Sequence, residues 1–163
     1  EVHDDDGLVT QRRRELSYVS GRFMTEHLIR VHQLFEGDLT AAVVLATVAQ
    51  HGVQRYYEEV ARHSAAGFDR LVAEGAHVDH LRPCNALSVS HATGIPRETV
   101  RRKVRWLQRR GWLEIGPRGR LSVVPRMADD FAEFDLETIE RLHACSLAMQ
   151  RVLDAPTGST AAT

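Results

Sequence analysis

A glycine and a proline two positions apart, in the run Gly94-Ile95-Pro96, separate two helical patterns in the middle of the chain. Gly94 can adopt the left-handed backbone that ends a helix abruptly. Pro96 presets the backbone for the first turn of a new helix. The sequence therefore predicts a helix that ends near Thr93, a tight turn plugged by Ile95, and a second helix directly after it.

The second helix separates its apolar residues from its basic ones. At about 100° per residue, one narrow stripe contains Val100, Val104 and Leu107. The opposite face carries one acid and four arginines: Glu98, Arg101, Arg102, Arg105 and Arg109. Arginine is the side chain best suited to forked contacts with phosphates and guanine edges. We therefore expect a helix that packs by its apolar stripe and presents its arginines to an anion such as DNA.

A β-hairpin is predicted directly after this helix, which must end at Gly111. Two short apolar runs, residues 112–115 and 121–124, read as paired strands. The sequence between them, Gly116-Pro117-Arg118-Gly119-Arg120, gives the hairpin a basic tip. We expect Arg118 and Arg120 to reach phosphate or the minor groove, as the tip of a wing does.

The charge of the chain is unevenly distributed. The formal net charge is −1. Between residues 97 and 120, however, nine basic residues face only Glu98 and Glu114, a local charge of +7 that leaves −8 for the rest. The basic residues are Arg97, Arg101, Arg102, Lys103, Arg105, Arg109, Arg110, Arg118 and Arg120. A basic region within an acidic chain indicates one face built for a polyanion.

The run from Thr93 to Arg102, followed by Leu107, by Gly111-Trp112-Leu113 and by the basic tip, resembles the winged helix-turn-helix of bacterial transcriptional regulators. The GntR, IclR and MarR families share this pattern. Helices before the domain and one long helix after it make the layout most similar to MarR-type regulators, because a GntR protein would carry the domain at its N-terminus. The resemblance implies a homodimer that binds a palindromic operator in double-stranded DNA, with a small-molecule effector of unknown identity.

The predicted fold is mainly α with a small β-hairpin wing, a winged helix-turn-helix flanked by dimerisation helices. Residues 10–83 are expected to form a helical dimerisation and support region, 84–125 the DNA-binding region, and 126–154 a C-terminal helix. The segments 1–9 and 155–163 are expected to be disordered tails. Within the support region, residues 10–35 predict one helix or two joined near Gly21. Asp38 is the expected N-cap of an apolar helix that begins at Leu39 and is interrupted at Gly52.

The sequence also suggests a role for each DNA-binding residue. The candidates are Arg97, Glu98, Thr99, Arg101, Arg102, Arg105, Arg109, Arg118 and Arg120. Arg101, Arg102 and Arg105 are expected to face the floor of the major groove, and Arg97 and Arg109 the phosphates. Glu98 has two interpretations. Its carboxylate either accepts a hydrogen bond from a cytosine amino group, or it only stabilises the N-terminus of the helix through its negative charge. Trp106 lies off both faces of the helix and is expected to pack against the neighbouring strand.

Other functions have weaker support in the sequence. His77, His80 and Cys84 could supply three metal ligands, and Glu59 with His63 a further pair, but no strong zinc spacing is present. Tyr56 and Tyr57 could line a ligand pocket, although a core position is the simpler interpretation. No phosphate loop or nucleophile motif is found. We expect no enzyme, no cofactor and no metal; the alternative is a winged-helix protein-interaction or metal- or ligand-sensing adaptor.

The chain has no run of about 18 apolar residues, so no membrane partner is expected. Its two cysteines, Cys84 and Cys145, are far apart and form no disulfide framework. Both features favour a cytoplasmic protein.

Overall fold

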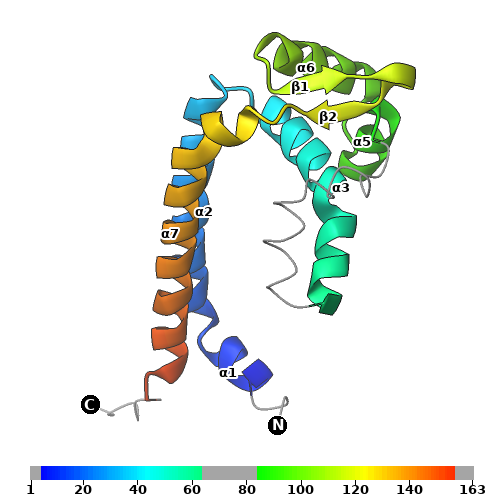
Figure 1. The fold of residues 1–163 in the computed structure, drawn as a ribbon. Helices are drawn as coiled ribbons and strands as arrows, with labels where there is room; N and C mark the ends of the chain where they lie inside the picture. Colours follow the sequence, from blue (N-terminus) through cyan, green and yellow to red (C-terminus); the bar gives the residue numbers. More distant parts are fainter. Residues whose placement is uncertain (1–4, 64–83, 157–163) are drawn as a thin grey trace. The chain divides into compact units, whose positions relative to one another are not determined.

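The computed structural model describes the backbone of residues 5–63 and 84–156, and the side chains of residues 7–51 and 84–156. The described part is mainly helical with one two-stranded antiparallel sheet (Figure 1), as the sequence predicts. The helices are α1 (Asp5–Gln11), α2 (Arg13–Leu34), α3 (Leu39–His63), α5 (Ala86–Thr93), α6 (Arg97–Arg109) and α7 (Met127–Asp154). Strands β1 (Leu113–Ile115) and β2 (Leu121–Val123) flank the short 3₁₀ turn η2 (Pro117–Gly119).

The chain divides into two compact units. One contains Phe35–Asp130, and the other contains Glu1–Leu34 together with Phe131–Thr163. None of the helices among the described residues combines the length and apolarity needed to cross a lipid bilayer.

The unit Phe35–Asp130 contains most of the buried apolar side chains. Helix α3 packs against α6, α5 and β2. Its contribution to the core is Ala41, Val44, Leu45 and Val48, each no more than 3% exposed. The other buried apolar residues of the unit, among those whose side chains are described, are Phe35, Cys84, Val89, Val100, Val104, Leu107, Trp112, Leu113 and Leu121. Because apolar burial is the main stabilising force of a fold, α3 is the support on which α5, α6 and the hairpin rest.

This grouping differs from the predicted support region of residues 10–83. The first half of α3 belongs with α5 and α6 because its buried apolar side chains lie in the unit Phe35–Asp130, within which α3 packs on those helices. Helix α3 is also continuous through Gly52, where a break was considered. The sequence also indicates a short helix around Phe68 and a His-rich segment that ends at Pro83, and both lie outside the described residues.

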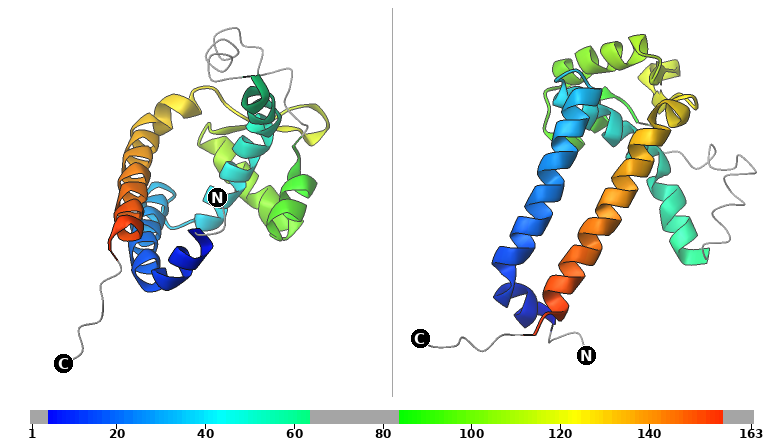
Figure 2. Two further views of the ribbon diagram at one scale, coloured as in Figure 1. Left: turned by 90° about the horizontal axis from the view of Figure 1, so that it is seen from below. Right: turned by 90° about the vertical axis from the view of Figure 1, so that its left-hand side faces the viewer.

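In the other unit, α2 and α7 run side by side and antiparallel (Figure 2). Arg30 of α2 donates to Glu137 of α7 at 2.7 Å, and Arg141 of α7 donates to Glu26 of α2 at 3.2 Å. Among the described residues of this unit, only Leu16 and Phe131 are buried hydrophobic residues. Two helices alone therefore leave most of their apolar surface uncovered.

Of the two alternatives left open at Gly21, the structure has the continuous helix, whereas the expected disorder of residues 1–9 differs from the structure. Helix α2 passes through Gly21 without a break, and the interruption falls at Arg12, between α1 and α2. Residues 5–9 lie in α1, although residues 1–9 were expected to be disordered. The Arg12 guanidinium donates to the carbonyls of Ala155 and Pro156 at 2.8 and 3.0 Å, which ties this end of the chain to the end of α7.

Candidate nucleic-acid interface

The turn between α5 and α6 is held by hydrogen bonds from small polar side chains. Gly94 ends α5 in the left-handed conformation with φ 72°, as predicted. The Ser90 hydroxyl donates to the Ile95 carbonyl at 2.7 Å, and the Ile95 N–H donates to the Thr93 hydroxyl oxygen at 3.2 Å. Ile95 is half-buried rather than a fully buried plug. The hydroxyls of Ser90 and Thr93 are thus part of what sets the direction in which α6 leaves the turn.

Helix α5 begins with a capping box at its N-terminus. The Asn85 side-chain oxygen accepts from the backbone N–H groups of Leu87 and Ser88 at 2.9 and 3.1 Å. The Ser88 hydroxyl in turn accepts from the Asn85 N–H at 2.8 Å. These bonds give α5 a defined start beside the hairpin.

The apolar stripe of α6 is buried as predicted. Val100 and Leu107 are 0% exposed and Val104 is 3% exposed. Two cations beside this stripe bind acids from the segment before α3: Lys103 pairs with Asp38, and Arg110 pairs with Glu36. The ion pair of Lys103 with Asp38 accommodates its charge beside the buried stripe. Two of the nine basic residues thus serve the fold.

An aromatic cluster supports the end of α6 and the start of β1. Phe35 lies 5.5 Å from the ring of Trp112 and 6.4 Å from that of Trp106, and the two indoles lie 6.0 Å apart. The Arg110 guanidinium lies 4.7 Å from the Trp106 ring. Trp106 therefore packs within the protein, as expected, although its partners include Phe35, which sequence reasoning did not assign to this region.

The predicted hairpin is present and is joined to the start of α5. Strands β1 and β2 pair in the register Leu113 with Val123, Glu114 with Ser122, and Ile115 with Leu121. Leu121 also donates its N–H to the Cys84 carbonyl at 2.7 Å. This bridge, which the sequence did not indicate, fixes the hairpin next to the N-terminus of α5.

The hairpin tip holds one arginine in an unusual backbone conformation. Arg118 has φ 58° and ψ 21°, in the left-handed region. A residue with a side chain pays about 1 kcal/mol for this conformation. Arg118 and Arg120 are both exposed. The strain at Arg118 lies in the residue that the sequence singled out for contact with DNA.

All the predicted site residues belong to this one unit, and most are exposed. Arg97, Glu98, Arg101, Arg102, Arg105, Arg109, Arg118 and Arg120 are exposed, whereas Thr99 is half-buried. Arg101 has a loose ion pair with Glu98 at 3.4 Å. In the part of the chain that the structure describes, the other arginines of this set have no carboxylate within 4.0 Å. Their charges are therefore directed to solvent.

A groove of about 360 Å³ lies between α6, the hairpin and the start of α5. Its lining includes Arg97, Arg101, Arg105 and Arg118, with Asn85, Ala86, Leu87, Val104, Ile115, Gly119 and Leu121. No acidic residue lines it. The groove thus combines four guanidinium groups with an apolar floor.

The described residues contain no cluster of side chains that could hold a metal ion. No group of three or more potential ligands is found there. His77 and His80, and the side chains of Glu59, His63, Tyr56 and Tyr57, lie outside the described part. Cys84 is 2% exposed, and this burial raises the pKa of its thiol. The hydrogen bond from Ser88 lowers the pKa, but by less than burial raises it.

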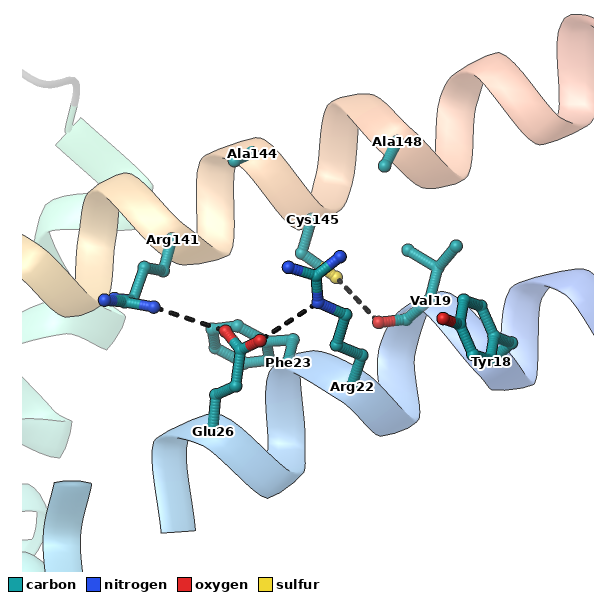
Figure 3. Close-up of a pocket in the computed structure, with 9 residues that line it drawn as sticks. All are labelled: Tyr18, Val19, Arg22, Phe23, Glu26, Arg141, Ala144, Cys145 and Ala148. Carbon is teal, nitrogen blue, oxygen red and sulfur yellow. Dashed lines mark hydrogen bonds and ion pairs between the residues drawn. The ribbon is translucent and has the colours of Figure 1, made fainter. Parts of the chain in front are cut away.

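A second hollow, of about 350 Å³, lies between α2 and α7 (Figure 3). Its apolar lining is Tyr18, Val19, Phe23, Ala144, Cys145 and Ala148. Glu26 accepts from Arg22 at 2.9 Å and from Arg141 at 3.2 Å, and the hydrogen bond from Arg22 is the main cause that holds the pKa of Glu26 below its ordinary value. Because these charges are paired with one another, the hollow offers mainly apolar surface.

No known family model matches the chain, and neither the curated proteins nor the solved structures contain a significant match to it.

Proposed function

We propose that the chain is a sequence-specific DNA-binding transcriptional regulator, in which α5, the turn, α6 and the hairpin form a winged helix-turn-helix. The observation that carries this proposal is the two-sided character of α6. Its apolar stripe is buried, and its opposite face holds exposed arginines, of which Arg101 alone has a carboxylate partner among the described residues, Glu98 at 3.4 Å. A helix anchored on one side and cationic on the other suits the major groove of DNA.

The local charge supports the same proposal. The region from residue 97 to 120 carries +7 in a chain of net charge −1. Lys103 and Arg110 are paired with acids of the same unit, so the charge left for a ligand is concentrated on the exposed face of α6 and on the hairpin tip. Phosphates of a duplex would release counterions on binding such a face, which makes affinity steeply dependent on salt.

The proposed regulator acts as a homodimer on a palindromic operator, with α2 and α7 as its dimerisation helices. Large apolar side chains on these helices are at least 45% exposed: Tyr18, Met24, Leu28, Ile29, Leu136, Ile139, Leu142 and Leu147. The hollow between α2 and α7 adds further apolar surface. A two-helix unit with so little buried core gains stability when a second copy completes a helical bundle. A two-fold dimer would present two α6 helices about 34 Å apart, one turn of DNA.

The experiment that tests the proposal is a gel-shift assay of the full chain with fragments of its own genome at two salt concentrations. A regulator retains a small set of fragments and loses affinity between 50 and 200 mM salt, by about a thousandfold for six phosphate contacts. Genome-wide capture of bound fragments then supplies the operator. Binding of no fragment, or binding that is insensitive to salt, would favour a protein-interaction module and overturn the proposal.

A further inference from the structure

The arginines of α6 fall into two rows, and only one row faces the hairpin. Arg97, Arg101 and Arg105 are spaced four residues apart and all line the groove beside the hairpin. Glu98, Arg102 and Arg109 do not line the groove. At about 100° per residue these three lie nearly opposite Val100, whose side chain is fully buried. The second row therefore projects furthest from the body of the unit.

The groove has the chemistry of a site for a sugar-phosphate chain. Its lining arginines belong to two elements, three of them to α6 and one, Arg118, to the hairpin tip. Apolar side chains also line the groove, of which Val104 and Leu121 are buried and Leu87 and Ile115 are about half exposed. Deoxyribose offers C–H surface to such a floor, while the phosphates on either side of each sugar offer oxygens to arginine.

The start of α5 adds a further donor to this groove. Ala86, the first residue of α5, lines the groove. The Asn85 side chain accepts from Leu87 and Ser88, and no bond to the Ala86 N–H is found in the described part of the chain. A free N–H at a helix N-terminus favours an anion. The Ala86 N–H would thus be an additional donor to an anion that the arginines bind, and the arginines define the site without it.

The geometry points to a backbone clamp: the groove binds the sugar-phosphate chain of one DNA strand, held between Arg97, Arg101 and Arg105 on one side and Arg118 on the other. This inference rests on the proposed function. A helix inserted in the major groove, with a hairpin beside it, must straddle the strand that borders that groove.

The clamp changes the roles expected from the sequence. Arg101 and Arg105, which were expected to face the groove floor, are assigned to phosphates. The ion pair of Arg101 with Glu98 is long, at 3.4 Å, and both side chains are exposed, so a phosphate can replace the carboxylate. Arg102, in the projecting row, is assigned to base edges.

The test is phosphate-ethylation interference on the operator, combined with the salt dependence of affinity, for the full chain and its variants. The clamp variants are Arg105→Ala and Arg118→Asn; asparagine tolerates the left-handed backbone at that position. We expect each to weaken binding to operator and to scrambled duplex by a similar factor, about tenfold. Each should reduce the log–log salt slope by about 0.9. Interference should disappear at neighbouring phosphates of the same strand in both variants.

Two controls give these results their meaning. Arg120→Asn removes one charge from the same hairpin but from a residue outside the groove lining, so interference at the clamp phosphates should remain. Arg102→Ala should also keep those phosphates, while losing protection of guanine N7. Circular dichroism of each variant shows that the fold is retained.

The clamp is overturned if Arg105→Ala keeps the phosphate interference and the salt slope of the wild type but loses discrimination at one base pair. It is equally overturned if Arg105→Ala and Arg118→Asn affect phosphates on different strands. A wild-type chain that binds no duplex at any salt concentration overturns the proposed function and the clamp together. The first two outcomes leave the proposed function intact.

Discussion

Asp38 binds both the start of α3 and the middle of α6 through its two carboxylate oxygens. Its Oδ1 accepts from the backbone N–H of Ala41 at 3.0 Å, which caps α3, and its Oδ2 accepts from Nζ of Lys103. Burial would raise the pKa of Asp38, but the bonds from Lys103 and Ala41, with the charge of Arg102, outweigh it and hold the pKa below its ordinary value. One carboxylate thus ties the arginine-bearing helix to its support.

Two substitutions of Asp38 should distinguish the stability that comes from the helix cap from the stability that comes from the ion pair. Asp38→Asn keeps a capping side chain, whereas Asp38→Ala removes both interactions and should be less stable by about another 1 kcal/mol. Because the folded-state pKa is lowered, the contribution of the charged form is complete above about pH 4 and is lost as the pH falls through the folded-state value. Urea unfolding at pH 7 and pH 3 measures both effects. If Asp38→Asn loses as much stability as the wild type between pH 7 and pH 3, Asp38 is not the group that causes the pH dependence of stability.

Removing Arg102 should alter the base preference of DNA binding. We expect Arg102→Ala to lose about 1–3 kcal/mol on the operator and to accept other bases at one position of each half-site. Fluorescence anisotropy with a set of single-base operator variants measures this change. Gln108→Ala, an exposed and uncharged neighbour on α6, is the matched control and should bind as the wild type does. A uniform loss across all operator variants would assign Arg102 to phosphates.

Trp112 should contribute mainly through ring packing. Its Nε1 donates to Asp130 at 3.2 Å, and its ring packs against Phe35 and Trp106. Trp112→Phe keeps an aromatic ring and loses the hydrogen bond, so it should destabilise by about 1 kcal/mol. Trp112→Ala leaves a cavity and should destabilise by about 3–5 kcal/mol. Denaturant unfolding gives both values, and equal losses would show that the Asp130 bond dominates.

The proposed dimer predicts that an arginine introduced into α7 disrupts dimerisation at one position and not at the next. Ile139 is 63% exposed and apolar, and its neighbour Glu140 is exposed and charged. Ile139→Arg should shift the protein to monomer in sedimentation velocity because the new charge would be buried in the dimer interface. Glu140→Arg introduces the same side chain one residue away, at an exposed position that already carries a charge, and should leave the mass unchanged. A monomeric wild type, or an Ile139→Arg protein that remains dimeric, would contradict this interface.

The sequence predicted the segment from α5 to β2 closely because the signals there are local. A left-handed Gly94 ends α5, and the burial of Val100, Val104 and Leu107 follows from their spacing on a single helix. The hairpin likewise depends on neighbouring residues, and its strands were placed within one residue of their observed ends. Contacts within a few residues of each other are set by backbone geometry, which the order of the residues determines directly.

The tertiary structure decided what lies beside these elements. Nothing near Phe35 in the sequence indicates that it packs on Trp106 and Trp112. A helical wheel places the arginines of α6 on one face, but only the position of the hairpin, joined to Cys84 through Leu121, separates the row that lines the groove from the row that projects. Such pairings depend on which apolar surfaces bury each other best when the whole chain folds. That is a property of many distant residues together, and no local pattern contains it.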